Sequence, residues 1–445
     1  MLKISKIKTP MESEKIAIKI IHFLTLISIF YLLYYYRQGG IKDAGLTETT
    51  IRDLGPYIDG GIKILHGENP YIPISTRSGT FGALPLTIMS LIIPDNFKTF
   101  IFQILNLSGA IYFLNTVFAN KEKMIKRLAT ILLLWTSPVR EMLVTNQVTG
   151  IVLGFLAIGI RTHTVTYSKN YKYGILQFIT ALTFGIAIDL KPHITIMFVV
   201  IYLLNKRDFK AMTDCLILWI TIHVLIDLTQ WRILEIDYAK FILGLAETAQ
   251  NNELGDSVAF WPIISSITPI QTTNVSVIVL TTLSFLTLIL SLKKQNRIAI
   301  VLSLLIPAFS IYFHFYDAIP IVVLVLFYSV ETRSYVFSFL TLSFFWIPKE
   351  FTKPVNITMI LVLSFLFCGI MYIGKINFLR KALGSILGLF LAFIIHLVNL
   401  QINSNVLLEQ SIAVTECLLF SIVLFCTTEH YYKYRLKDIP PEIII

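Results

Sequence analysis

Charged residues are scarce in this sequence, at 14% of its 445 positions, whereas 55% of the positions are hydrophobic. Soluble domains carry about 25% charged residues. Together with a mean hydropathy of +0.73, this scarcity excludes an ordinary soluble domain. Cysteine is rare too, and all four cysteines lie in apolar runs, where they form neither a disulfide framework nor a metal site: Cys215, Cys368, Cys417 and Cys426.

The sequence also lacks the local patterns of common soluble active sites. HExxH, GxSxG, Walker A and GxGxxG do not occur in the contexts that their chemistry requires. No polar segment is long enough to form a cytoplasmic domain that could bind a nucleotide sugar. A membrane enzyme built on this chain would therefore need an activated substrate delivered by lipid.

Apolar runs of spanning or nearly spanning length are abundant, which predicts an all-α polytopic membrane protein. The first run, 16–36, follows a basic start and lacks a small-residue cleavage site, so we interpret it as an uncleaved anchor. Several later runs are shorter than the roughly 20 residues of a straight span, which indicates broken helices. We expect a transmembrane domain over residues 1–428 and a cytoplasmic tail at 429–445. It would contain roughly 13–15 transmembrane or re-entrant helices.

The formal net charge of +10 does not point to nucleic acid, because the basic residues gather in short alternating loops at 121–127, 161–172, 206–210, 293–297, 375–381 and 433–437. This is the positive-inside pattern of a protein of the cell membrane. It predicts cytoplasmic termini and long outer loops at 37–79 and 229–273. The alternation holds only if the run at 81–94 is a partial or re-entrant helix. The alternative is a full crossing with another span miscounted.

The outer segment 37–79 is the least membrane-like part of the chain. Within it, apolar residues recur with helical spacing, which predicts an amphipathic helix on the membrane surface: Leu54, Ile58, Ile62 and Leu65. Asp53 precedes this helix and is the candidate catalytic group, with Asp59 as the alternative. The competing interpretation is that Asp53 only caps the helix.

Further polar residues fall on the same predicted side, where ionisable groups usually face a cavity or a partner. Lys191 interrupts two apolar runs and could bind a phosphate at membrane depth, or only extend to the interface. His314 and Asp317 are spaced to meet on one helical turn, but two ligands are too few for a metal. Arg140, Asn146 and Gln147 could line a sugar or phosphate site, or satisfy the ends of two short helices.

Several of these motifs resemble glycosyltransferase family 87, within the polyprenol-phosphate-sugar-dependent GT-C superfamily. The first outer loop carries the likeness in Asp53-Leu54-x-x-Tyr57 and in Leu65-His66-Gly67-x-Asn69-Pro70-Tyr71. The resemblance continues discontinuously to about residue 320, through Leu84-Pro85-Leu86, Ser137-Pro138, Asn146-Gln147, Lys191-Pro192 and the segment 307–320. It departs where the family more often has a Tyr-Pro-Pro-Leu-like start and a Gly-Gln pair.

The resemblance implies a GT-C fold and an inverting, mannosyltransferase-like enzyme. Its donor would be a polyprenyl-phosphate hexose or pentose, and its acceptor a lipid-linked or cell-envelope glycan on the non-cytoplasmic face. No cofactor is implied. Asp53 would be the general base, and Lys191 and His314 would lie near the donor phosphate. The other substrate-binding candidates are Tyr57, Asn69, Tyr71, Arg140, Asn146, Gln147, His193 and Asp317.

Two other classes of protein compete with this hypothesis. A flippase or transporter of lipid-linked sugars is favoured by broken spans and intramembrane charge. It is disfavoured by the clustering of polar residues on one side, since alternating access needs both faces. A structural scaffold leaves the long outer loops unexplained.

Replacing Asp53 by Asn separates its two interpretations, because Asn caps helices about as well as Asp but cannot take up the proton. If Asp53 is the base, we expect Asp53→Asn to fold normally and to transfer a radiolabelled sugar roughly 10²- to 10⁴-fold more slowly. The matched variant Asp59→Asn should be much less affected. Near-parental transfer by a folded Asp53→Asn protein shows that the residue only caps, and a large loss in Asp59→Asn alone assigns the role to that carboxylate.

Overall fold

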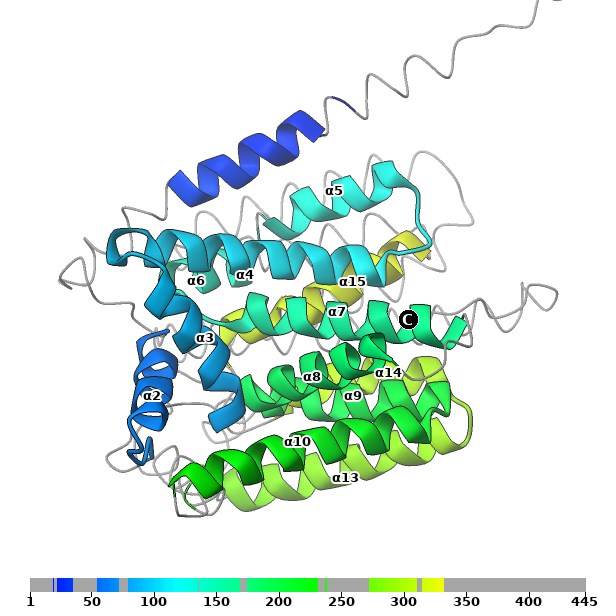
Figure 1. Cartoon of the computed structure of the whole chain (residues 1–445). Coiled ribbons are helices and arrows are strands. Elements are labelled where there is room, and N and C mark those ends of the chain that lie inside the picture. The colour runs from blue at the N-terminus through cyan, green and yellow to red at the C-terminus, as the bar shows by residue number, and fades with distance from the viewer. Residues whose placement is uncertain are drawn as a thin grey trace, which may run out of the picture.

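The computed structural model describes residues 19, 22–34, 54–71, 79–134, 136–168, 174–230, 237, 272–309 and 314–331. Every regular element in these ranges is a helix, as the sequence predicts (Figure 1). Asp53 and the runs predicted beyond residue 331 lie outside the described residues. The total of roughly 13–15 helices therefore stays a prediction.

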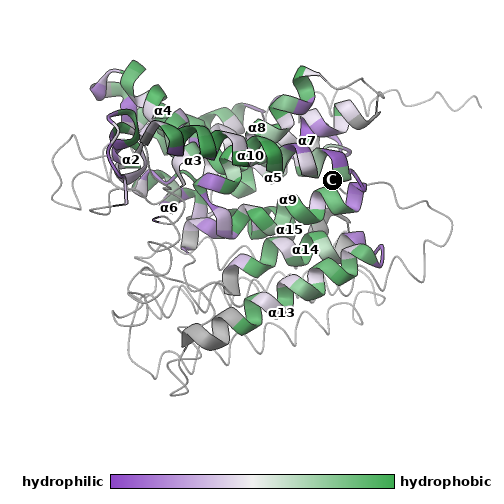
Figure 2. Ribbon diagram, turned by 60° about the horizontal axis from the view of Figure 1, so that its bottom comes forward, coloured by the Kyte–Doolittle hydropathy of each residue, from purple (hydrophilic) through white to green (hydrophobic). Residues whose placement is uncertain are grey.

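Three described helices are long and apolar enough to cross a membrane: Phe97–Val117, Thr149–Thr166 and Phe209–Thr229. A bent pair, Ile125–Leu134 with Pro138–Thr145, would make a fourth span. Shorter apolar helices accompany them, as the short runs predict, at His22–Tyr34, Thr80–Ile92, Ile175–Leu190, Pro192–Lys206 and Ile278–Leu292. Hydrophobic residues dominate the middles of the helices, and hydrophilic residues gather towards the ends (Figure 2).

Most of the helices run side by side across Figure 1. They are α4 (Asp95–Val117), α5 (Lys123–Leu134), α7 (Thr149–Ser168), α8 (Ile175–Leu190), α9 (Pro192–Lys206), α10 (Phe209–Gln230), α13 (Thr272–Leu292), α14 (Asn296–Leu305) and α15 (Ile319–Glu331). The α4–α5, α9–α10 and α13–α14 turns lie together at the right of Figure 1. We call this the basic end, because these turns carry the lysines and arginines of the predicted inner loops.

The opposite end holds α2 (Gly55–Leu65) and α3 (Thr80–Ile92), which lie across the ends of the long helices (Figure 1). We call it the α3 end. The segments predicted to be outside and the turns predicted to be inside therefore occupy opposite ends of the bundle. Which end faces the cytoplasm stays a prediction.

Helix α2 has the predicted position but not quite the predicted buried face. Leu54 and Ile58 are buried, whereas Leu65 is 52% exposed and Ile64 is buried in its place. The face is rotated because α2 packs closely on α3, where Thr87 Oγ1 donates to the carbonyl of Ile58 at 3.0 Å. The N-cap of α2 is Leu54, whose own side chain makes no capping hydrogen bond.

Helix α3 runs from the last turn of α8 to the start of α4, across one end of the bundle (Figure 1). Its start is fixed to the last turn of α8, where the Gly79 N–H donates to the Asp189 carbonyl at 3.0 Å, and its end leads directly into α4 (Figure 1). With 13 residues it is about 20 Å long, short of the roughly 30 Å hydrocarbon core. This geometry favours a helix that does not cross the membrane over the alternative of a full crossing.

Helix α4 organises the middle of the bundle through its contact with α7. A side chain at Gly109 would clash with the backbone of Gly150, so the two backbones touch. Small residues allow such close approach between membrane helices. Around this contact, Gln103 Nε2 donates to the Leu143 carbonyl at 2.9 Å, and Asn106 Oδ1 accepts from the Ile151 N–H at 3.1 Å.

One short helix was not predicted. Helix α6 (Ser137–Thr145) occupies a segment whose polar residues were predicted to line a sugar or phosphate site or to satisfy the ends of two short helices. Its local signals are nevertheless present: Pro138 stands at the helix start, and Asn146 ends the helix in the left-handed conformation (φ 53°). The polar residues Arg140 and Glu141 interrupt the apolar pattern and hide it.

Cysteine labelling tests this two-ended arrangement. In a background without the four native cysteines, we expect Glu122→Cys and Lys294→Cys to react from one side of sealed vesicles and Glu68→Cys from the other, because they lie at opposite ends of the bundle. Membrane-impermeant maleimide added to oriented vesicles measures the accessible side. Labelling of Glu122→Cys and Glu68→Cys from the same side contradicts the placement of α3 as a helix that does not cross.

Candidate functional site

Three breaks between helices meet towards the α3 end of the bundle, opposite the basic end (Figure 1). The first lies between α6 and α7 at Asn146, and the second lies between α8 and α9 at Lys191, where φ is −146° and ψ is 77°. The third precedes α15 and contains the 3-10 helix η2 (Phe315–Ala318), against which α6 packs. Irregular backbone at membrane depth is tolerated where protein buries it or where it lines a cavity.

Asp317 is the point at which the three breaks join. Lys191 Nζ lies 2.6 Å from its Oδ1, and Thr149 Oγ1 donates to the same oxygen at 3.0 Å. His193 Nε2 lies 3.3 Å from Oδ2. The side chains of Lys191 and Asp317 are 4% and 0% exposed, so this is a buried ion pair.

The surroundings of Asp317 favour negative charge. Helices α7 and α9 and the 3-10 helix η2 all begin beside it, and each helix N-terminus carries partial positive charge. Lys191 balances the carboxylate, so the charge of the cluster depends on His193, whose side chain is 25% exposed. A protonated His193 leaves the cluster with one net positive charge.

The cluster lies at the depth of the middle of α4. Asn106, which binds the first turn of α7, is 11 residues into the 23-residue helix, or about 16 Å from its start. Thr149, at the start of α7, bonds Asp317. Charged groups at this depth of a candidate span are costly and usually functional.

Asn146 and Gln147 present unused amide groups near this cluster. Asn146 is 3% exposed, and neither its Oδ1 nor its Nδ2 has a hydrogen-bond partner among the described residues. The side-chain oxygen of Gln147 is likewise buried without one. Thr149 follows Asn146 by three residues, so the Cα atoms of these two residues lie within roughly 10 Å of each other. A buried amide without a partner is destabilising unless a ligand or water completes it.

His314 and Asp317 meet across one turn, as their spacing predicts, and cap η2 reciprocally. The His314 N–H donates to Asp317 Oδ2 at 3.2 Å, and the His314 ring stacks on Tyr316. Lys191, predicted to face a phosphate or the interface, is buried against Asp317, with its ammonium 4.6 Å from the centre of the Tyr316 ring. His193 is the most exposed cationic candidate of the cluster.

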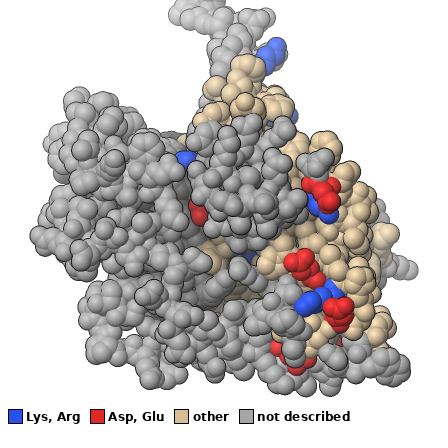
Figure 3. All heavy atoms as spheres, turned by 90° about the vertical axis from the view of Figure 1, so that its left-hand side faces the viewer, with Lys and Arg blue, Asp and Glu red and all other residues tan. Residues whose placement is uncertain are grey.

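The predicted residues of the first outer loop lie on α2 and just after it, at the α3 end (Figure 1). Asn69 Nδ2 donates to Asp237 Oδ2 at 2.7 Å, which joins the two predicted outer loops. Tyr57 and Tyr71 are buried in the hydrophobic core, and Asp59 is exposed on α2. Figure 3 views this end and shows acidic and basic side chains gathered on the described part of it. Arg140, on α6, is partly exposed.

A second buried polar group was missed by the sequence analysis. His223 Nδ1 lies 3.2 Å from Thr80 Oγ1, and its Nε2 is 3.2 Å from Asp189 Oδ1, at an ion-pair distance without hydrogen-bond alignment. Asp189 Oδ2 also accepts from the Gly82 N–H at 2.6 Å. Asp189 therefore caps α3 from another helix. His223 could have been singled out only as an ionisable residue inside an apolar run.

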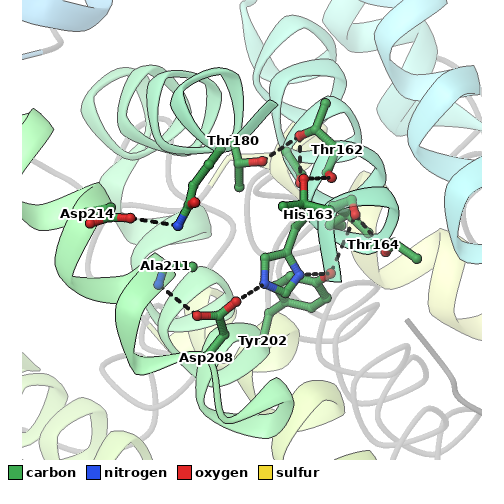
Figure 4. A network of polar contacts seen from close by, with 12 residues as sticks. Thr162, His163, Thr164, Thr180, Tyr202, Asp208, Ala211 and Asp214 are labelled. Carbon is green, nitrogen blue, oxygen red and sulfur yellow. Dashed lines mark hydrogen bonds and ion pairs between the residues drawn. The ribbon is translucent and has the colours of Figure 1, made fainter. Parts of the chain in front are cut away.

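A further network lies at the basic end (Figure 4). His163 bonds Tyr202 through Nδ1 and Asp208 through Nε2, both at 3.1 Å, and Asp208 Oδ1 accepts from the Ala211 N–H at 2.8 Å. Asp208 precedes the first residue of α10 and caps that helix. This network ties together α7, α9 and α10 and has the features of a structural contact.

No group of three or more His, Cys, Asp or Glu side chains in the described ranges could hold a metal ion. Comparison with known proteins adds no assignment: no protein-family model, no curated protein and no solved structure matches the chain.

Removing the charge of Asp317 tests the buried pair. Asp317→Asn leaves the Lys191 ammonium buried without its counter-ion, so we expect a loss of about 3–5 kcal/mol in the free energy of unfolding, measured by denaturant unfolding in detergent. Asp95→Asn is the matched control, because Asp95 pairs with Lys98 but is 82% exposed; it should cost no more than about 1 kcal/mol. Adding Lys191→Met to Asp317→Asn should recover much of the loss. Equal costs for the two single variants contradict the buried pair.

Proposed function

We propose that this protein is an integral membrane glycosyltransferase of the GT-C type that uses a polyprenyl-phosphate sugar as its donor. The observation that carries the proposal is the convergence of three helix breaks on a buried charged cluster at the depth of the middle of α4. Near it, polar atoms of Asn146 and Gln147 are buried without a hydrogen-bond partner among the described residues. A lipid-borne phosphate sugar brings a negative charge and several hydroxyl groups to that depth. The resemblance of the first outer loop to glycosyltransferase family 87 supports the same function.

The donor phosphate would bind through His193 rather than through Lys191. Lys191 is held by Asp317, whereas His193 is the partly exposed member of the cluster. Its contact with Asp317 orients the ring. The nearby helix N-termini add fixed positive potential. Asn146 and Gln147 would hydrogen-bond hydroxyl groups of the sugar.

The chemical step would be a single inverting displacement at the anomeric carbon. The acceptor hydroxyl oxygen attacks this carbon, while the bond from the carbon to the phosphate oxygen breaks on the opposite face. The phosphate leaves with the bonding electrons, and its charge is stabilised by His193 and the helix N-termini. Asp53 takes the proton of the acceptor hydroxyl. Asp59 remains the alternative base.

Transport of a lipid-linked sugar is the second candidate, and discontinuous helices around a central charged site favour it. The two functions differ in product. A transferase moves the label to a new lipid or glycan, whereas a flippase leaves the donor intact and changes only its side of the membrane.

The proposal is tested by incubating membranes that contain the protein with several radiolabelled polyprenyl-phosphate sugars and following the label into glycolipid. We expect transfer from one of them. We also expect His193→Gln to raise the donor concentration for half-maximal rate about tenfold or more, because it removes a charge-assisted contact. Asn146→Gly should reduce transfer about fivefold to tenfold without unfolding, since Gly accepts its left-handed backbone.

His22→Gln is the control, since His22 is exposed on the first helix, outside the cluster. Label that crosses the membrane unchanged, without new glycolipid, supports the flippase instead. Parental donor use by folded His193→Gln and Asn146→Gly proteins rules out the cluster as the donor site.

A further inference from the structure

A groove at the basic end is separate from the cluster around Asp317. It has a volume of about 410 Å³ and lies between the α9–α10 turn and the α13–α14 turn. Arg207 lines one wall and Lys294 the other, and none of the described residues that line it is acidic. The nearest acid in sequence, Asp208, is already bound to His163 and to the start of α10.

The floor of the groove is polar and fixed. Ser291 Oγ donates to Asn205 Oδ1 at 2.7 Å, and Asn205 Nδ2 donates to the Asn296 carbonyl at 3.1 Å. These bonds hold the two turns together across α9, α13 and the start of α14. The groove therefore has defined walls and is more than a gap between loops.

Both cations sit in unfavourable backbone conformations. Arg207 and Lys294 are left-handed, with φ of 53° and 63°, at the ends of α9 and α13. Glycine would occupy such positions without the cost of about 1 kcal/mol that other residues incur. Both side chains are exposed, and neither forms an ion pair with another described residue. Local packing therefore does not explain why both positions are occupied by cationic residues.

Apolar side chains line the groove beside the two cations. Phe209 and Leu292 also line it and are 58% and 69% exposed. The α10 helix that begins at Phe209 is one of the candidate spans, so the groove lies where a span meets the membrane edge. A ligand with an anionic head and an apolar body fits this combination, whereas a free anion uses only the two cations.

We propose that this groove binds the headgroup of an anionic phospholipid, with the phosphate diester between Arg207 and Lys294 and the first acyl segments against Phe209 and Leu292. Basic pockets between membrane helices bind anionic headgroups in this way. The positive-inside rule alone predicts exposed cations at this end but not a walled groove between two of them. The site is independent of the proposed sugar transfer.

The test uses the purified full-length chain in detergent, incubated with vesicles of equal parts phosphatidylglycerol and phosphatidylcholine and then repurified. Mass spectrometry of the retained lipids gives the ratio of phosphatidylglycerol to phosphatidylcholine. We expect the parent protein to retain phosphatidylglycerol in excess. Each cation should contribute about fivefold, so Arg207→Gln with Lys294→Gln should lower the ratio about 25-fold.

The control, Lys123→Gln with Lys293→Gln, removes the same charge from the same end without touching the groove lining. It should keep the parental ratio, and the thermal midpoints of both double variants should match the parent. Equal losses in the two double variants show only diffuse surface attraction and overturn the site. An unchanged ratio in the groove variant overturns it as well, and displacement of the lipid by millimolar inorganic phosphate shows a free-anion site instead.

Discussion

The carboxylate of Asp317 has to be neutralised inside an apolar bundle, and the arrangement of the surrounding helices follows from this requirement. An uncompensated charge there would cost several kcal/mol. Lys191, His193 and Thr149 reach it from two separate helix breaks, and its own η2 segment supplies a backbone N–H. Unbroken helices would bring only side chains to this point. The breaks bring helix N-termini as well, so short helices are a consequence of the buried charge.

A compensated charge also limits which groups can act on a ligand. Lys191 is the strongest cation near the cluster, but its ion pair with Asp317 and its contact with the Tyr316 ring occupy it. The more exposed and weaker base, His193, is left to meet a substrate. In the same way, His314 is occupied by the reciprocal cap that it forms with Asp317. The side chains of Asn146 and Gln147 are among those with buried polar atoms that lack a hydrogen-bond partner in the described part of the chain.

Sequence patterns were sufficient for the helical class, the short apolar helices, the two-ended distribution of charge and the position of α2 and α3. They were sufficient because hydropathy and loop charge act locally along the chain. The pairing of Lys191 with Asp317 could not be predicted, since 126 residues separate the partners and each motif alone fits several environments. The rotation of α2 depends on the crossing with α3, and α6 was missed because its polar residues break the apolar period. Lys191 and Asp317 were nevertheless both chosen as candidates, since charge inside an apolar sequence is conspicuous.

The last turn of α8 serves two sites at once. Asp189 receives the first turn of α3 through the Gly82 N–H, and two residues later Lys191 holds the carboxylate beside α15. The intervening backbone is a single helical end, with no loop between the two contacts that could absorb a displacement. A shift of α3 away from the bundle would therefore pull on the lysine that anchors the buried charge. The position of α3 and the geometry of the buried ion pair are mechanically linked through the three consecutive residues from Asp189 to Lys191.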